Sequence, residues 1–116
     1  MMKISFLAIC LLFTAFASHA TDFCQKLDAR ANVEGAQLLP RMGFSVSGKG
    51  RLYFHSAPSE QCRISKFVVP KDSLIGYQDF GVWTSVMYVH PVTHEDTMGW
   101  VKTNRLKVTG TMSAQP

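Results

Sequence analysis

The sequence lacks the features that mark several classes of protein. It has no internal repeat, no low-complexity tract, no run of like charges and no basic stripe of the kind that binds nucleic acid. It also lacks a nucleophile elbow, a metal-binding motif and a phosphate-binding loop. Its 12 Lys and Arg residues are scattered among 8 Asp and Glu residues, a weak basic excess that suits anionic partners such as cell-wall polymers or acidic protein surfaces. These absences disfavour nucleic-acid binding, cofactor chemistry and catalysis.

Long apolar runs are also scarce, and the only one lies at the start of the chain. Lys3 precedes the apolar segment Ile4–Ala17, and the segment Ala17–Ala20 places small residues at positions −3 and −1 of a cut after it. The run is shorter than the roughly 20 residues that a membrane-spanning helix needs, which disfavours the alternative of a retained anchor. The pattern predicts a signal peptide over residues 1–20 and export to the periplasm or beyond, with no membrane association after cleavage.

Cysteine is rare, with three residues in the chain. Export would remove Cys10 and leave Cys24 and Cys62, an even number in an oxidising compartment, which predicts a disulfide between them. The bridge would close a loop that stabilises the fold by about 4 kcal/mol in the chain-entropy model. Two buried free thiols are the alternative. A catalytic cysteine is disfavoured, because pairing would consume both candidates.

The first part of the expected mature chain has a helical pattern. Phe23, Leu27 and Ala31 recur at i, i+4 and i+8 after Asp22, which is a favourable N-cap residue. The spacing predicts one or two turns of amphipathic helix, which Asn32 and Gly35 end. We expect this helix to belong to an N-terminal extension over residues 21–43, tied to the remainder by Cys24.

From residue 44 onward, the pattern is that of short strands separated by turns. Aromatic and β-branched residues, bounded by Gly, Pro and Asp, predict strands over Arg51–His55, Lys66–Val69, Leu74–Tyr77, Val82–Val89 and Gly99–Val101. Both faces of Val82–Val89 are largely apolar, which predicts a central strand covered on both sides. The intervals predict a mainly β domain, a small barrel or sandwich, over residues 44–108, followed by a loose tail over residues 109–116.

Four blocks in this region resemble bacterial SH3-like (SH3b) domains. Leu52–Ser59 is similar to the opening L-Y-V-R-S-G-P-S of these domains. Phe67–Leu74 is similar to the downstream pattern in which Lys, Gly and one variable residue stand between two hydrophobic residues. Gly81–Tyr88 resembles their G-W-x-x-V-x-Y strand, and Gly99–Leu106 resembles their closing G-W-V-x-x-x-Y-L. The resemblance implies a small SH3-like β-barrel of about five strands, with the short helical extension as an addition.

A shallow groove of the SH3 type would use aromatic side chains, since these offer a large contact area at low entropic cost. The candidates are Tyr53, Tyr77, Trp83, Tyr88 and Trp100. The alternative for each is a place in the core of the small barrel. Trp100, between Gly99 and Val101, is expected to be partly exposed.

The hairpin loop His90–Met98 is the second candidate, because long loops on a rigid scaffold often bind partners. His90, His94, Glu95 and Asp96 supply imidazoles and carboxylates, but no helix places them on one face for a metal ion, so we expect no metal site. A nucleophile–base pair of His55 and Ser56 is disfavoured as well, because neighbours in a strand point to opposite faces.

These observations predict an exported, non-enzymatic protein that acts by binding. In the first hypothesis it recognises a protein, as an immunity-type inhibitor of a cell-wall-targeting toxin, with the His90–Met98 loop as the element that blocks a cleft. In the second it binds peptidoglycan, as the SH3b resemblance implies. A small cell-wall enzyme is the third and weakest possibility.

Overall fold

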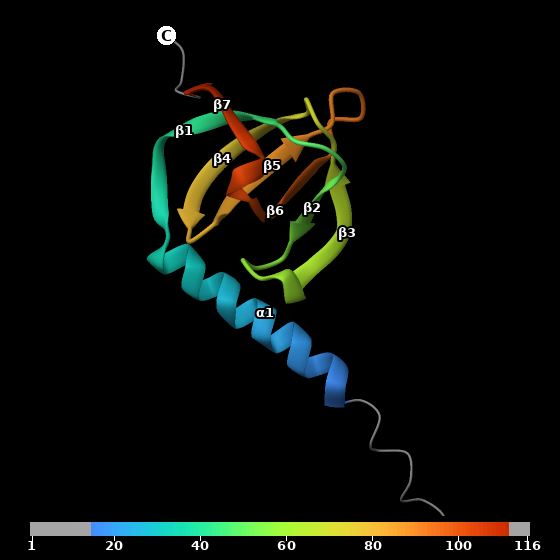
Figure 1. The fold of residues 1–116 in the computed structure, drawn as a ribbon. Coiled ribbons are helices and arrows are strands. Elements are labelled where there is room, and N and C mark those ends of the chain that lie inside the picture. The colour runs from blue at the N-terminus through green and yellow to red at the C-terminus, as the bar shows by residue number, and fades with distance from the viewer. Residues whose placement is uncertain (1–14, 112–116) are drawn as a thin grey trace, which may run out of the picture.

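The computed structural model describes the backbone of residues 15–111 and the side chains of residues 21–111. The first fourteen residues of the expected leader and the last five of the expected tail lie outside this range. The described chain contains one α-helix and seven strands (Figure 1). These are α1 (Ala15–Glu34), β1 (Ala36–Val46), β2 (Leu52–His55), β3 (Arg63–Val68), β4 (Ser73–Phe80), β5 (Trp83–Val89), β6 (Asp96–Lys102) and β7 (Leu106–Thr111), with single 3-10 turns η1 (Glu60–Cys62) and η2 (Thr103–Arg105).

All seven strands belong to one antiparallel sheet with the order β3-β2-β6-β5-β4-β1-β7. The prediction of a mainly β fold is confirmed, whereas the expected strand number of about five is wrong. β5 is the fourth strand of the seven, so its predicted central position is also confirmed. Val82 is not part of it, because this residue lies in the turn before β5 and is 65% exposed.

The two strands that the sequence did not predict, β1 and β7, lie side by side at one edge of the sheet. β1 falls largely inside the expected extension over residues 21–43, and Pro40 together with a register shift between Gln37 and Met42 breaks its alternation. β7 shows no alternation because nearly all its side chains are exposed. It includes residues 109–111, so the described part of the expected loose tail is strand.

Helix α1 is longer than predicted and begins before Asp22, which therefore lies inside the helix and not at its N-cap. Exposed ion pairs at i,i+4 join Asp22 to Lys26 and Arg30 to Glu34. The buried face is formed by Cys24 and Ala31, with Leu27 partly buried. Phe23, expected on this face, is 44% exposed.

Gly35 follows the last helical residue, as predicted, whereas Asn32 lies inside the helix and does not end it. The amide of Gly35 donates to the carbonyl of Ala31 over 2.8 Å. A Cβ atom at position 35 would lie 2.7 Å from this same carbonyl oxygen and 2.9 Å from that of Asp79, so a larger residue would not fit there. Among the described residues, no helix has the combination of length and apolar character needed to cross a membrane.

The sheet has an apolar cluster on each face. One cluster contains Phe44, Val46, Leu52, Phe54, Val68, Leu74, Val86 and Val101, with Leu106 packed against it. On the other face, α1 covers Trp83 and Trp100 through Ala31, with Phe80 beside them. Figure 1 shows the helix lying across one end of the curved sheet.

The loop between β5 and β6 is shorter than expected. β6 begins at Asp96, so the connection covers residues 90–95 only. The predicted strand Gly99–Val101 is the middle of a longer strand that pairs with β5 along its whole length.

Candidate functional site

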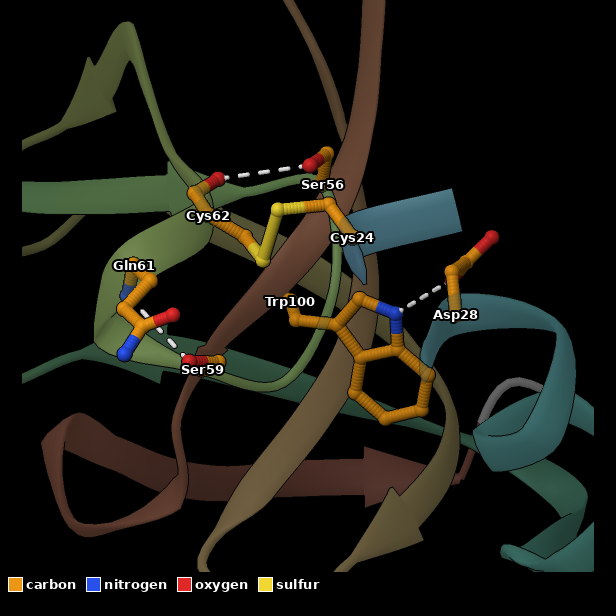
Figure 2. Close-up of a disulfide and its surroundings, with 7 residues drawn as sticks. All are labelled: Cys24, Asp28, Ser56, Ser59, Gln61, Cys62 and Trp100. Atoms are coloured by element: carbon orange, nitrogen blue, oxygen red, sulfur yellow. Dashed lines mark hydrogen bonds between the residues drawn. A yellow bond between two sulfur atoms is a disulfide. The ribbon is translucent and has the colours of Figure 1, made fainter. Parts of the chain in front are cut away.

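The tryptophans do not form an exposed groove. Trp100 is 2% exposed and Trp83 is 7% exposed, so the expectation that Trp100 is partly exposed is wrong. The indole Nε1 of Trp100 donates a hydrogen bond to Asp28 Oδ1 over 2.7 Å, as Figure 2 shows. A segment far away in the sequence, α1, covers both rings, which is why β-strand patterning alone gave no sign of their burial.

His55 lies beside these tryptophans and is also buried, at 5% exposure. Its ring meets Trp83 edge-on at 4.6 Å, and its Nδ1 lies 3.2 Å from the carbonyl oxygen of Trp100, to which it donates. Burial lowers the pKa of His55, while the hydrogen bond to Trp100 and the charge of Glu60 oppose this effect. The Nε2 atom has no hydrogen-bond partner among the described residues and lies 3.7 Å from Glu60 Oε1.

Glu60 itself is paired with a cation, since its Oε2 lies 2.6 Å from Lys102 Nζ. This contact is the main reason that the pKa of the Glu60 carboxyl is lowered. Lys102 also lies over the ring of Trp83, at 4.9 Å from its centroid. His55, Glu60 and Lys102 therefore form a small charged group at the edge of the helix-covered face.

The histidine loop is stabilised by its own backbone. His90 Nδ1 accepts hydrogen bonds from the amides of Val92 and Thr93, at 3.1 and 3.2 Å, so this nitrogen is occupied. The His90 ring also packs edge-on against Tyr88 at 6.2 Å, and burial raises the pKa of the Tyr88 hydroxyl. His94 is exposed and adopts a positive φ of 65°. Within residues 21–111, no three His, Cys, Asp or Glu side chains are grouped to hold a metal ion.

Two predicted aromatics, Tyr53 and Tyr77, are partly buried and lie against arginine side chains; Arg41 lies over the Tyr77 ring at 4.4 Å from its centroid, and Tyr53 belongs to a larger charged cluster. In the arginine–tyrosine cluster, formed by Arg51, Tyr53, Arg63 and Phe67, the guanidinium carbon of Arg63 lies 3.5 Å from the Tyr53 ring centroid. The Tyr53 ring is 5.5 Å from that of Phe67, and Arg51 lies over Phe67 at 4.2 Å. Arg51 Nη1 also donates to the Tyr53 hydroxyl over 3.4 Å. Hydrogen bonds from Arg51 and then Arg63 lower the pKa of Tyr53.

The strand register brings this cluster together. Tyr53 on β2 pairs directly with Phe67 on β3, and His55 pairs with Arg63. Arg51 is two residues before Tyr53, so it faces the same side of the sheet. Arg105 anchors the turn before Arg51, because its guanidinium donates to the carbonyls of Ser47 and Gly50 over 2.6 and 2.7 Å.

A groove adjoins the cluster on the helix side. It has a volume of about 450 Å³ and is lined by α1, by β3 and by the segment around η1, with Arg63 shared between groove and cluster. Both cysteines, Cys24 and Cys62, line it. They form a disulfide (Figure 2), which confirms the predicted pairing. Asp28, Gln25 and Gln61 are among its other lining residues.

The predicted site residues therefore fall into three places. Trp83 and Trp100 lie under the helix, while Tyr88, His90 and His94 lie at the β5–β6 loop. Tyr53 lies in the arginine–tyrosine cluster. The sequence analysis did not identify three residues of this cluster, Arg51, Arg63 and Phe67. The i,i+2 spacing of Arg51 and Tyr53 could have placed these two residues on one face. The pairing with Arg63 and Phe67 required the register.

Comparisons with protein-family models, with curated proteins and with solved structures found no match to this chain.

Proposed function

We propose that the protein is an exported, non-enzymatic binding protein of the SH3-like type that recognises a protein partner. In this proposal it acts in the periplasm as an immunity-type inhibitor of a cell-wall-targeting toxin. The observation that carries the binding role is the arginine–tyrosine cluster, because Arg and Tyr dominate the binding energy of many protein interfaces.

The cluster suits binding because it is exposed and already ordered. Tyr53, Arg63 and Phe67 lie on paired strands and Arg51 directly precedes β2, and stacking fixes the side chains of Arg51 and Arg63 before any partner arrives. Binding would therefore cost less side-chain conformational entropy than it would if the arginine side chains were free in the unbound protein. The cluster is a better candidate surface than the His90–Glu95 loop, whose first histidine bonds to the loop backbone.

The exported location is supported by the disulfide and by the expected leader. Disulfides persist in oxidising compartments and are rare in the cytosol of mesophiles. The Cys24–Cys62 bond is compatible with export, and it also holds α1 beside the cluster.

The immunity role can be tested by deleting the gene that encodes this protein from its source cell. A strain without the chain, grown in contact with the parental strain, is expected to lyse, because it lacks protection against the toxin of its siblings. Export of the wild-type chain should restore survival. Equal survival of the two strains would overturn the immunity role.

Purified sacculi separate the two binding hypotheses. The toxin-inhibitor hypothesis predicts that the protein stays in the supernatant when sacculi are sedimented. Strong co-sedimentation would instead support the second hypothesis, direct peptidoglycan binding. Hydrolysis of sacculi by the pure protein would overturn both.

A further inference from the structure

In the arginine–tyrosine cluster, the guanidiniums stack on aromatic rings, and this arrangement leaves guanidinium N–H groups available for hydrogen bonds to a ligand. Along the stack, Arg63 lies on Tyr53, Tyr53 neighbours Phe67, and Arg51 lies on Phe67. A guanidinium that lies on a ring uses its face for the contact, whereas its N–H donors point outward in its own plane. Apart from the groups that donate to the Tyr53 hydroxyl, the N–H groups of both guanidiniums therefore remain available for hydrogen bonds.

Neither arginine is neutralised. Within residues 21–111, no carboxylate lies within ion-pair distance of the guanidinium of Arg51 or Arg63. Both residues are exposed. Arg51 donates to the Tyr53 hydroxyl oxygen, which leaves the hydroxyl proton free to be donated onward. Two cations and one O–H donor thus lie on one exposed face of β2 and β3.

We propose that this face binds an acidic segment of a protein partner, with carboxylates received by the guanidinium edges of Arg51 and Arg63 and by the hydroxyl of Tyr53. The inference rests on the proposed function, because it names the chemistry by which the partner is recognised. Planar guanidiniums match carboxylates in a bidentate geometry, and charge-assisted hydrogen bonds of this kind are stronger than neutral ones.

The surroundings favour a short acidic segment over a long polyanion. Glu60 is a largely exposed carboxylate and lies near enough to Arg63 for the two charges to interact. Asp28 lines the adjoining groove together with Arg63. A nucleic acid or an anionic wall polymer that continued past the cluster in this direction would meet the carboxylate of Asp28 and the Glu60–Lys102 ion pair, whose net charge is zero. A segment with one or two carboxylates at the cluster would not.

The test uses protein expressed from the complete chain and hexaglutamate as the probe. Binding is followed by the NMR signals of the arginine Nε–H groups and of the Tyr53 ring. Wild type is expected to bind saturably, and more weakly as salt is added. R51Q and R63Q should each weaken binding about tenfold. The control K107Q removes an equal charge from exposed β7 and should change binding by less than about twofold.

A second variant separates geometry from net charge. R63K keeps the positive charge but lacks the planar fork, so it should weaken binding nearly as much as R63Q. Unchanged spectra elsewhere in the protein establish that the variants are folded.

Three results would overturn the proposal: absence of saturable binding, equal loss in K107Q, or wild-type binding by R63K. A single-stranded DNA oligonucleotide bound as tightly as hexaglutamate would also overturn it, because the face would then be a general polyanion surface. The proposed immunity function can fail in its own test while the acidic-segment site is supported. If hexaglutamate binding depends on the arginines while the strain without the chain survives contact with its parent, the acidic-segment site stands and the immunity role falls.

Discussion

The tryptophans and Tyr53 differ in what covers their side chains. Trp83 and Trp100 are buried beneath α1, and Trp100 is tied to that helix by its bond to Asp28. Tyr53 instead contacts Arg51, Arg63 and Phe67, which belong to the same surface. Substitutions of the tryptophans should therefore change stability, whereas substitutions around Tyr53 should change binding.

Asp28→Ala tests the role of the buried indole. The substitution leaves Trp100 Nε1 without its acceptor in a buried site, which is expected to lower the free energy of unfolding by about 1–3 kcal/mol. Asp22→Ala, on the same helix, removes an exposed ion pair with Lys26 and should cost less than about 1 kcal/mol. Urea denaturation measures both. Equal effects of the two substitutions would mean that the indole bond contributes nothing specific.

At the scale of elements, α1 is held to the sheet at separate points. The disulfide joins Cys24 to the end of η1, and one turn later Asp28 meets Trp100. Ala31 packs against both tryptophans near the helix end. Because the groove lies between this helix and β3, the disulfide determines the shape of the groove as well as the stability of the fold.

Removal of the disulfide should therefore destabilise the whole domain. Cys24 and Cys62 are 38 positions apart, so a C24S/C62S variant is expected to lose about 4 kcal/mol of unfolding free energy through the greater entropy of its unfolded chain. Denaturation of this variant should coincide with that of the reduced wild type, which is the control. A loss below about 1 kcal/mol would show that the helix contacts alone hold the element in place.

At the scale of the whole molecule, stability should depend on pH through His55. Burial lowers the folded-state pKa of His55 below the ordinary value of 6.5. The charged groups near its ring are Glu60 and Arg63, and Glu60 is in turn paired with Lys102. Between the two pKa values the unfolded chain binds more protons than the folded one. Stability therefore rises with pH through this window and is lost as the pH falls below 6.5.

His55→Phe should flatten this dependence. In wild type, the unfolding free energy is expected to fall by up to about 1.4 kcal/mol per pH unit from this residue as the pH is lowered below 6.5. The Phe variant keeps a ring against Trp83 but cannot take up a proton, so its slope should be smaller. His94→Gln, an exposed control, should retain the wild-type slope. Parallel slopes for wild type and the Phe variant would contradict the attribution of this pH dependence to His55.

Local pattern determined the class of the fold and much of its strand layout. The sequence placed a central strand at β5 and a helix end at Gly35, because each depends on a residue and its immediate neighbours. The Cys24–Cys62 pair was also predictable, since only two cysteines remain once the expected leader is removed.

Tertiary structure alone decided what is buried and what is brought together. Nothing in the residues around Trp100 indicates that a helix some 70 positions away covers it and accepts its N–H bond. β1 and β7 stabilise each other by pairing, although neither has a clear strand pattern. The arginine–tyrosine cluster depends on the register that sets Tyr53 against Phe67. Alternation is a local property, whereas burial and pairing depend on segments that meet only when the chain has folded.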